Sequence, residues 1–471
     1  MWWFRLLLIM TKKLNELSII EARDGLRTKK FSSRELVQAC LDQIQKHDPK
    51  IHAFLALNDQ AVKQAEKADL NLPLGGIPIA VKDNFLTIGL PTTASSKVLE
   101  GYQPHYESTV SKKLLAAGAI IIGKTNMDAW AHGSSTETSD FGSTKNPWNT
   151  DYLPGGSSGG SAASVAADMC MAAIGSETAG SIRQPAAWCG VTGFKPTYGR
   201  VSRYGVIAMA SSTDSPGPIT KTVTDSAEIL NIIAGNDPQD ATTSPRPIEN
   251  YLKFPSQKTY TIGVPGEYLE VLSSPARALI ESAVEVLKKA GHKIKTISLI
   301  PPKYSIGVYT ILQRSEVSSN LARFTGVRYG HDRSFFGDEA KRRIMLGTYA
   351  LSAGYYDQYY AKAQKVRTLI VTDFEKAFKD VDLIINPPSP GPALKVGATE
   401  NEAMFGEMQD ILVEPSSIAG LTGISVPCGF IDGLPVGFGF IGRQFDETKV
   451  LSLATQFQSL TSFHHAKPSL T

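Results

Sequence analysis

Two turns rich in glycine and serine, at 155–161 and 175–185, constrain this chain more than any other part of it. Residues 162–173 between them are rich in alanine and predict one helix with small side chains. Glycines at such density let the backbone approach a ligand closely, and successive N–H groups of such a turn can converge on a negative atom. Serine hydroxyls beside those donors meet the needs of acyl transfer, a nucleophile and an oxyanion hole. A flexible linker is the alternative, but linkers are compositionally uniform, and residues 182–188 read Ile-Arg-Gln-Pro-Ala-Ala-Trp.

The composition is that of a soluble globular protein with a large core, with 42% hydrophobic and 20% charged residues among 471. The net charge of +3 is too small to indicate a nucleic-acid-binding surface, which would need clustered lysine and arginine. The four cysteines are scattered and form no Cys-x-x-Cys pair, so neither a zinc site nor a disulfide framework is indicated. We therefore expect no metal in this chain and a reducing, cytoplasmic location.

The first ten residues are apolar, but a membrane span needs about 20 such residues. A signal peptide would place its charge before the apolar run and end in a small-residue cleavage site, and neither feature is present. Met10-Thr11-Lys12-Lys13 resembles an ordinary start. We predict that residues 1–10 are a non-structural extension, and we expect no contact with a membrane.

Helical and strand patterns alternate along the rest of the chain, which predicts one α/β domain over residues 11–471 with a parallel or mixed sheet and covering helices. Residues 11–70 are expected to be helical, with a capping box at Ser32-Ser33-Arg34-Glu35. Residues 201–220 are rich in small residues and predict turns. Further helices are predicted at 108–118, 222–233, 275–290, 354–380 and 446–460, and strands at 77–81, 119–122, 259–264, 292–299, 381–385, 424–426 and 436–441.

Gly156-Ser157-Ser158-Gly159-Gly160 formally satisfies the Gly-x-Ser-x-Gly pattern of a nucleophile elbow, which requires an acid and then a histidine later in the chain. The later candidates stand in no recognisable motif, and they are His292, His331, His464 and His465. The sequence also contains neither His-Glu-x-x-His nor a P-loop. Without a histidine, a lysine can act as base if burial lowers its pKa, and Lys82 at the end of a predicted buried strand meets that requirement.

Lys82 together with the two turns resembles the amidase signature family, whose members use a Ser–cis-Ser–Lys triad. The resemblance implies a large mixed central sheet covered by helices on both faces. It makes Ser181 the nucleophile, Ser157 the cis-serine that relays the proton, and Lys82 the base. It also places the oxyanion hole at the backbone N–H groups of Thr178, Ala179, Gly180 and Ser181. No cofactor is implied for this chain.

Further stretches resemble a branch of that family, the glutaminase components of aspartyl/glutamyl-tRNA amidotransferases. The stretches are 133–139, 195–203, 341–347 and 425–429. The resemblance implies that the chain hydrolyses glutamine and sends ammonia to a B subunit, which amidates Glu-tRNA(Gln) or Asp-tRNA(Asn) and carries the ATP and Mg sites. A small C subunit would complete a heterotrimer, and charged tRNA would be contacted mainly through the B subunit.

The resemblance also implies a glutamine pocket, in which Arg343 holds the α-carboxylate, Asp410 holds the α-ammonium and Tyr309 lines the wall. Alternatives remain for Arg343 and Asp410, since an arginine in Lys-Arg-Arg is usually solvated and an aspartate often caps a turn. The chain departs from the family pattern at Ala179, where glycine is common, and in a shorter segment at 330–336. Alternative functions are a stand-alone amidase for small amides and an inactive scaffold protein, and the intact triad argues against the scaffold.

Overall fold

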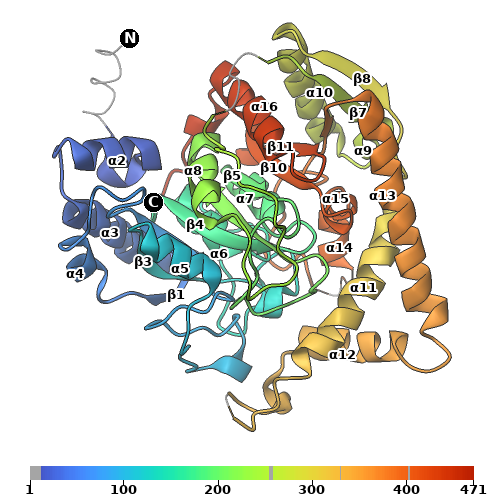
Figure 1. The fold of residues 1–471 in the computed structure, drawn as a ribbon, viewed down its shortest axis with the longest axis horizontal. Coiled ribbons are helices and arrows are strands. Elements are labelled where there is room, and N and C mark those ends of the chain that lie inside the picture. The colour runs from blue at the N-terminus through green and yellow to red at the C-terminus, as the bar shows by residue number, and fades with distance from the viewer. Residues whose placement is uncertain (1–11, 254–257, 329, 401, 403, 471) are drawn as a thin grey trace.

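Within the described residues, an 11-stranded mixed sheet runs through the molecule (Figure 1). The structure is a computed structural model that describes residues 12–253, 258–328, 330–400, 402 and 404–470. The predicted extension at 1–10 lies outside these residues, and the single domain over 11–471 stays a prediction. The predicted α/β class with a large mixed sheet is confirmed.

The strands follow the order β1-β3-β2-β4-β6-β5-β10-β11-β9-β7-β8. Strands β3, β2 and β4 are parallel neighbours, as are β9, β7 and β8, whereas the strands between these two groups pair antiparallel. The antiparallel hairpin of β10 and β11 joins the two parts of the sheet, because β10 pairs with β5 and β11 pairs with β9. The strands are β1 Phe54–Leu57, β2 Pro78–Lys82, β3 Ile120–Thr125, β4 Ala172–Glu177, β5 Thr192–Lys195, β6 Ser215–Thr220, β7 Thr261–Pro265, β8 Lys293–Ile297, β9 Leu383–Ile385, β10 Thr422–Ile431 and β11 Leu434–Gly442.

Helices cover both faces of this sheet. α6 and α7 pack together and contact the central strands, while α8 and α16 pack together on the other face. α11, α12 and α13 form a helical arm beside the sheet (right side of Figure 1). The helices are α2 Ile19–Arg27, α3 Ser33–Ile51, α4 Ala61–Ala65, α5 Thr109–Ala116, α6 Gly159–Ala166, α7 Arg183–Cys189, α8 Val223–Ile233, α9 Gly266–Leu269, α10 Ser274–Lys289, α11 Lys303–Leu321, α12 Asp338–Ala350, α13 Lys362–Asp380, α14 Phe405–Asp410, α15 Glu414–Ile418 and α16 Glu447–Leu460.

The predicted capping box is present at the start of α3. Ser32 is the N-cap residue, its hydroxyl accepts a hydrogen bond from the Glu35 N–H, and the Glu35 carboxylate accepts one from the Ser32 N–H. These bonds satisfy backbone donors that have no partner inside the helix. The apolar residues that follow at helical spacing are buried against the core, and they are Leu36, Val37, Cys40 and Ile44.

The single helix predicted over 162–173 is wrong in extent. α6 begins at Gly159 and ends at Ala166, and Ala172 and Ala173 belong to the fully buried strand β4. Between them Asp168 takes a left-handed backbone conformation with φ 55°, and its carboxylate pairs with Lys221 and Lys467. Alanine favours helices, but here it provides the small side chains that a strand needs between two packed layers.

Strands β1, β5 and β6 were not predicted, and for β1 and β6 the sequence argued against a strand. β1 interrupts the N-terminal region that was predicted to be helical, and pairs antiparallel with β3 at the sheet edge. β6 replaces predicted turns at 215–220, although it contains Pro216 and Pro218. Proline is uncommon inside a sheet because it cannot donate a backbone hydrogen bond, which explains this error.

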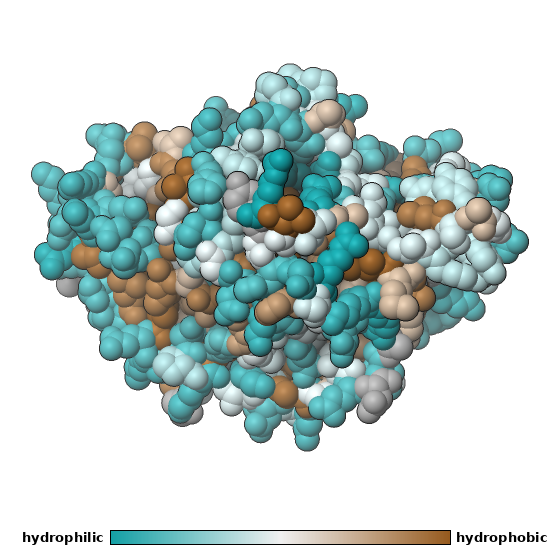
Figure 2. Space-filling model, turned by 90° about the horizontal axis from the view of Figure 1, so that it is seen from below, coloured by the Kyte–Doolittle hydropathy of each residue, from teal (hydrophilic) through white to brown (hydrophobic). Residues whose placement is uncertain are grey.

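Four tyrosines, Tyr355, Tyr356, Tyr359 and Tyr360, lie where a π-helical turn, Asp357–Ala361, leads into α13. The rings pack against one another, with 4.3 Å between the centroids of Tyr349 and Tyr355. Even so, Tyr355, Tyr356 and Tyr359 are between 37% and 46% exposed. On the face seen from below in Figure 2, apolar side chains gather in patches among hydrophilic ones.

Candidate active site

Lys82 is the last residue of β2, and its side chain is fully buried. Its Nζ donates hydrogen bonds to Ser157 Oγ at 2.8 Å and to the carbonyl oxygen of Ser176 at 3.1 Å. Burial lowers the pKa of Lys82 to about 7, although three nearby carboxylates act in the opposite direction. The neutral amine is therefore accessible near pH 7, and in that form it can accept the Ser157 proton.

Ser157 lies in the turn that leads into α6, and the peptide bond between Gly156 and Ser157 is cis. Gly156 packs tightly against the loop that carries Asp128. A Cβ on this glycine would lie 2.1 Å from Asp128 Oδ2 and 2.6 Å from the Ser135 nitrogen. The Gly156 N–H donates to Gln184 Oε1 at 3.0 Å. A side chain at position 156 would therefore push the turn, and Ser157 with it, away from its place.

Ser181 lies between β4 and α7, in the second glycine- and serine-rich turn. Its carbonyl oxygen accepts a hydrogen bond from the Ser158 N–H at 3.2 Å, which joins the two turns. The carbonyl of Ala179 accepts a hydrogen bond from Ser417 Oγ at 2.5 Å, and that of Gly180 accepts one from the start of α7 at 2.8 Å. The segment is thus held to the protein through its carbonyl groups. This arrangement suits the prediction that its N–H groups bind an oxyanion.

Alanine at position 179 fits this backbone. Ala179 is buried, and among the described residues it is not one of those with a positive φ. Its Cβ therefore carries no conformational penalty of the kind that would require glycine. The alanine at this position is therefore compatible with the backbone of the turn.

A buried ion pair between Glu177 and Arg183 stabilises the Ser181 turn, and the sequence analysis did not predict it. Arg183 donates to Glu177 Oε1 through Nη2 at 2.7 Å and through Nε at 2.8 Å. Glu177 Oε2 accepts from the N–H groups of Ile182 and Arg183, both at 3.0 Å. Arg183 Nη1 reaches Asn386 Oδ1 at 2.9 Å. Opposite charges on either side of Ser181 in the motif were the available signal.

The three residues predicted to bind glutamine are brought close to this turn by α11, α12 and α14. Tyr309, Arg343 and Asp410 are all buried, with exposed fractions of 6%, 5% and 4%. Asp410 Oδ2 accepts a hydrogen bond from Ser134 Oγ at 2.7 Å, while its buried Oδ1 has no partner among the described residues. A Cβ on Gly180 would lie 2.3 Å from Asp410 Oδ1, so this carboxyl touches the Ser181 turn.

Electrostatic interactions connect the three side chains. Arg343 Nε donates to Glu339 Oε1 at 2.5 Å, so this arginine faces inward instead of lying on a solvated helix face. Burial raises the pKa of Tyr309, while the charge of Arg343 lowers it and that of Asp410 raises it further. Burial also raises the pKa of Asp410 well above its ordinary value. A buried carboxyl with an unpartnered oxygen is suited to a cationic ligand group.

Three further charged residues of this pocket were missed. Arg314 Nη2 pairs with Glu407 Oε1 at 2.9 Å, and both side chains are buried. Glu414 is fully buried, its Oε1 has no partner among the described residues, and burial raises its pKa. Glu407 and Glu414 lie on either side of Asp410 at helical spacing, which was the signal in the sequence.

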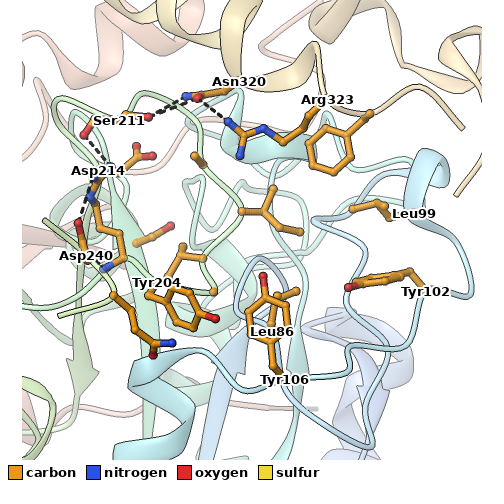
Figure 3. Close-up of a pocket in the computed structure, with 18 of the residues that line it drawn as sticks. Leu86, Leu99, Tyr102, Tyr106, Tyr204, Ser211, Asp214, Asp240, Asn320 and Arg323 are labelled. Carbon is orange, nitrogen blue, oxygen red and sulfur yellow. Dashed lines mark hydrogen bonds and ion pairs between the residues drawn. The ribbon is translucent and has the colours of Figure 1, made fainter. Parts of the chain in front are cut away.

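A cavity of about 820 Å³ lies beside the Lys82 site (Figure 3). Its wall includes Ser176, whose carbonyl accepts the Lys82 hydrogen bond, and Asp214, whose Oδ1 accepts a hydrogen bond from Thr178 Oγ1 at 2.7 Å. Aromatic and polar side chains form much of the rest of the wall, among them Tyr102, Tyr106, Tyr204, Asn320 and Arg323. The sequence analysis did not predict this cavity.

The candidate histidine His292 has a structural role, since its Nδ1 accepts a hydrogen bond from the Tyr260 N–H at 3.1 Å. Among the residues that the structure describes, no cluster of three or more histidine, cysteine, aspartate or glutamate side chains could hold a metal ion. Over the same part of the chain, no helix combines the length and the apolar character that crossing a membrane requires.

A family model for amidases matches residues 35–451. The chain belongs to the amidase family. It is 49% identical to the A subunit of the glutamyl-tRNA(Gln) amidotransferase of Geobacillus kaustophilus, over 96% of this chain and 99% of the relative. It is 47% identical to the corresponding protein of Carboxydothermus hydrogenoformans, over 97% of this chain and 100% of the relative. The crystal structure of the same component of the Thermotoga maritima glutamyl-tRNA(Gln) amidotransferase superposes with a TM-score of 0.84 at 40% identity, covering 98% of this chain and 99% of that one.

Proposed function

We propose that this chain is the glutamine-hydrolysing component, the A subunit, of a tRNA-dependent amidotransferase. The observation that carries the proposal is the buried contact between Lys82 Nζ and Ser157 Oγ, beside the turn that holds Ser181. A lysine whose pKa is lowered to about 7 can act as a general base in the way a histidine does in other hydrolases. The similarity to the glutamyl-tRNA(Gln) amidotransferases supports the choice of glutamine over other amides.

In the proposed reaction, Ser181 Oγ attacks the side-chain amide carbon of glutamine. The Ser181 proton passes to Ser157 while the Ser157 proton passes to the neutral Lys82 amine. The N–H groups of residues 178–181 receive the oxyanion of the tetrahedral intermediate. The proton then returns along the same path to the amide nitrogen, and the C–N bond breaks. Ammonia departs, and the γ-glutamyl group remains on Ser181 as an ester. Water attacks this ester by the same proton route and releases glutamate.

The charged ends of glutamine provide its recognition in this proposal. Arg343 binds the α-carboxylate, for which a planar guanidinium offers two parallel donors. Asp410 binds the α-ammonium through the oxygen that has no partner among the described residues. Tyr309 lines the wall between them. Binding both ends would place the amide group over the Ser181 turn that Asp410 touches.

The remaining parts of the proposal concern partners. A B subunit would use the ammonia, together with ATP and Mg, to amidate Glu-tRNA(Gln), Asp-tRNA(Asn) or both, and a small C subunit would hold the two together. Charged tRNA would contact the B subunit mainly. We propose a cytoplasmic location, where charged tRNA is available. Isolated chain should be a weak glutaminase, because hydrolysis without an acceptor would waste glutamine.

The test compares two ammonia sources in the complex copurified with this chain. Ser181→Ala and Lys82→Ala should nearly abolish amidation of Glu-tRNA with glutamine, while amidation with added ammonium salt continues. His292→Ala is the matched control and should stay within a few-fold of the parent. Loss of both activities, or a dead histidine variant beside an active Lys82→Ala, would contradict the proposal. Hydrolysis of small amides without any partner would favour the stand-alone amidase.

A further inference from the structure

Asp214 stands between the large cavity and the Ser181 turn, and it is only 6% exposed. Its Oδ1 accepts hydrogen bonds from Thr178 Oγ1 at 2.7 Å and from the Ala210 N–H at 3.1 Å. Its Oδ2 accepts one from the Met209 N–H at 2.9 Å. Figure 3 shows Asp214 among the residues lining the cavity, next to Ser211. These bonds to a hydroxyl and to two backbone N–H groups give the carboxyl a fixed position.

Two consequences follow from that position. Thr178 is the first residue of the segment whose N–H groups are assigned to the oxyanion, so the bond from its hydroxyl to Asp214 fixes one end of that segment. The negative charge of Asp214 also acts on Lys82, whose ammonium form it stabilises. One side chain thus acts on both the oxyanion segment and the base.

Resting on the proposed function, we propose that Asp214 is a positioning residue for amide hydrolysis by this chain. It holds Thr178 in place for oxyanion binding, and its charge is one of those that set how readily Lys82 gives up its proton. A dislocation of even about 1 Å at such a segment can cost about a hundredfold in rate. The sequence motif around Asp214 carries no hydrolase signature of its own, so this role comes from the placement alone.

The charged groups around Lys82 decide how the proposal can be tested. Asp128, Asp214 and Glu177 act on the amine from three different segments, and each favours its charged form. Glu177 is paired with Arg183, and Asp128 is held by several N–H and hydroxyl donors. Burial raises the pKa of Asp214 to about 6, while Arg203 acts to lower it. Asp214 is therefore mostly ionised at pH 7, where Lys82 loses its proton.

Asp214→Asn and Thr178→Val separate charge from hydrogen bonding. Asparagine keeps an oxygen for Thr178 but removes the charge, so the acidic limb of the kcat/KM profile should move to lower pH. Thr178→Val keeps the charge of Asp214 but removes the hydrogen bond from the threonine hydroxyl. The value of kcat should therefore fall roughly tenfold to a hundredfold, while the acidic limb of the kcat/KM profile stays at the same pH. Thr178→Ser should restore kcat. The measurement uses the full chain with its copurified partners.

The control for loss of a buried carboxylate is Asp225→Asn. Asp225 is fully buried with a pKa raised to about 7, and it accepts a hydrogen bond from the Ile19 N–H at 3.0 Å, away from the site. This variant should change the melting temperature and leave the pH profile where it was. An Asp214→Asn profile that coincides with that of the parent, or a Thr178→Val limb that moves equally, would overturn the inference.

A second readout does not depend on glutamine. Phenylmethanesulfonyl fluoride should sulfonylate Ser181, forming an Oγ–S bond as the S–F bond breaks, fluoride leaves and the serine proton passes through Ser157 to Lys82. The pH dependence of this inactivation should shift in Asp214→Asn as kcat/KM does. A parent that hydrolyses no glutamine yet is sulfonylated contradicts only the proposed function. A sulfonylation profile unmoved by Asp214→Asn contradicts the inference.

Discussion

The chemical corner of the site, Lys82 with Ser157 and the Ser181 turn, differs in construction from the recognition pocket around Asp410. The first is built from the ends of β2 and β4 and from tight turns, and Lys82 Nζ donates hydrogen bonds to Ser157 Oγ and to the Ser176 carbonyl oxygen. The second is built from helices α11, α12, α14 and α15, and its Asp410 and Glu414 each keep one buried oxygen without a partner among the described residues. The contact between Lys82 and Ser157 is thus present without a ligand, whereas the recognition pocket keeps carboxyl oxygens that a ligand could use.

The largest effect should come from breaking the chemical corner. Ser157→Ala removes the proton relay, and glutaminase activity should fall by about 10⁴-fold or more, as expected when one member of a catalytic unit is lost. The double variant Ser157→Ala/Lys82→Ala should be scarcely worse than either single variant, as steady-state rates would show. Two losses that multiply would mean that these residues act independently.

The recognition pocket should respond differently to Asp410→Asn. Loss of this carboxylate should raise the KM for glutamine, and kcat/KM should fall roughly a hundredfold, because the α-ammonium loses a buried charge partner. A substrate amide without the α-amino group should be affected far less. The comparison of the two amides by ammonia release tests the role, and an equal loss on both would show that Asp410 only supports the fold.

A change of pH should have a smaller effect than these substitutions, and it tests the base of the chemical corner. Lys82 must be neutral to accept a proton, so glutaminase activity should rise with pH through about 7, its lowered pKa, and level off above it. Lys195 provides a control, because it is also fully buried with a pKa lowered to about 7 but donates to the carbonyl oxygens of Pro196 and Leu421 instead of to Ser157. Lys195→Met should lower the melting temperature and leave the midpoint of the profile unchanged. A parent profile that is flat from pH 6 to 8 would contradict the lysine base.

The smallest effect should come from a segment assigned to neither region. A chain that starts at Met10 should keep the glutaminase activity of the parent, because residues 1–10 are predicted to be a non-structural extension. Soluble yield and steady-state rate of the two chains give the measurement. A large loss of soluble protein on removal of residues 1–9 would show that the extension takes part in folding.

The sequence carries a clearer motif for the chemical corner than for the recognition pocket, for a physical reason. A turn that must place backbone donors at a reacting atom tolerates few residue types. Gly156 and its neighbours can therefore be recognised as a motif in the sequence. The pocket charges come from separate helices, and Glu414 or Arg314 look like ordinary helix residues until the chain is folded. Strands β1 and β6 were missed because tertiary pairing outweighs local propensity, most clearly at Pro216 and Pro218.

The central position of the β10–β11 hairpin has a consequence for biosynthesis. The ribosome makes β1 to β6 early, but β5 finds its remaining neighbour only when residues 422–442 have been translated. Until then the growing chain presents an open sheet edge and an uncovered apolar core, which are the features that promote aggregation. A premature stop before residue 422 would leave the two parts of the sheet unjoined. Formation of the β10–β11 hairpin is thus the step that joins the two parts of the sheet into one fold.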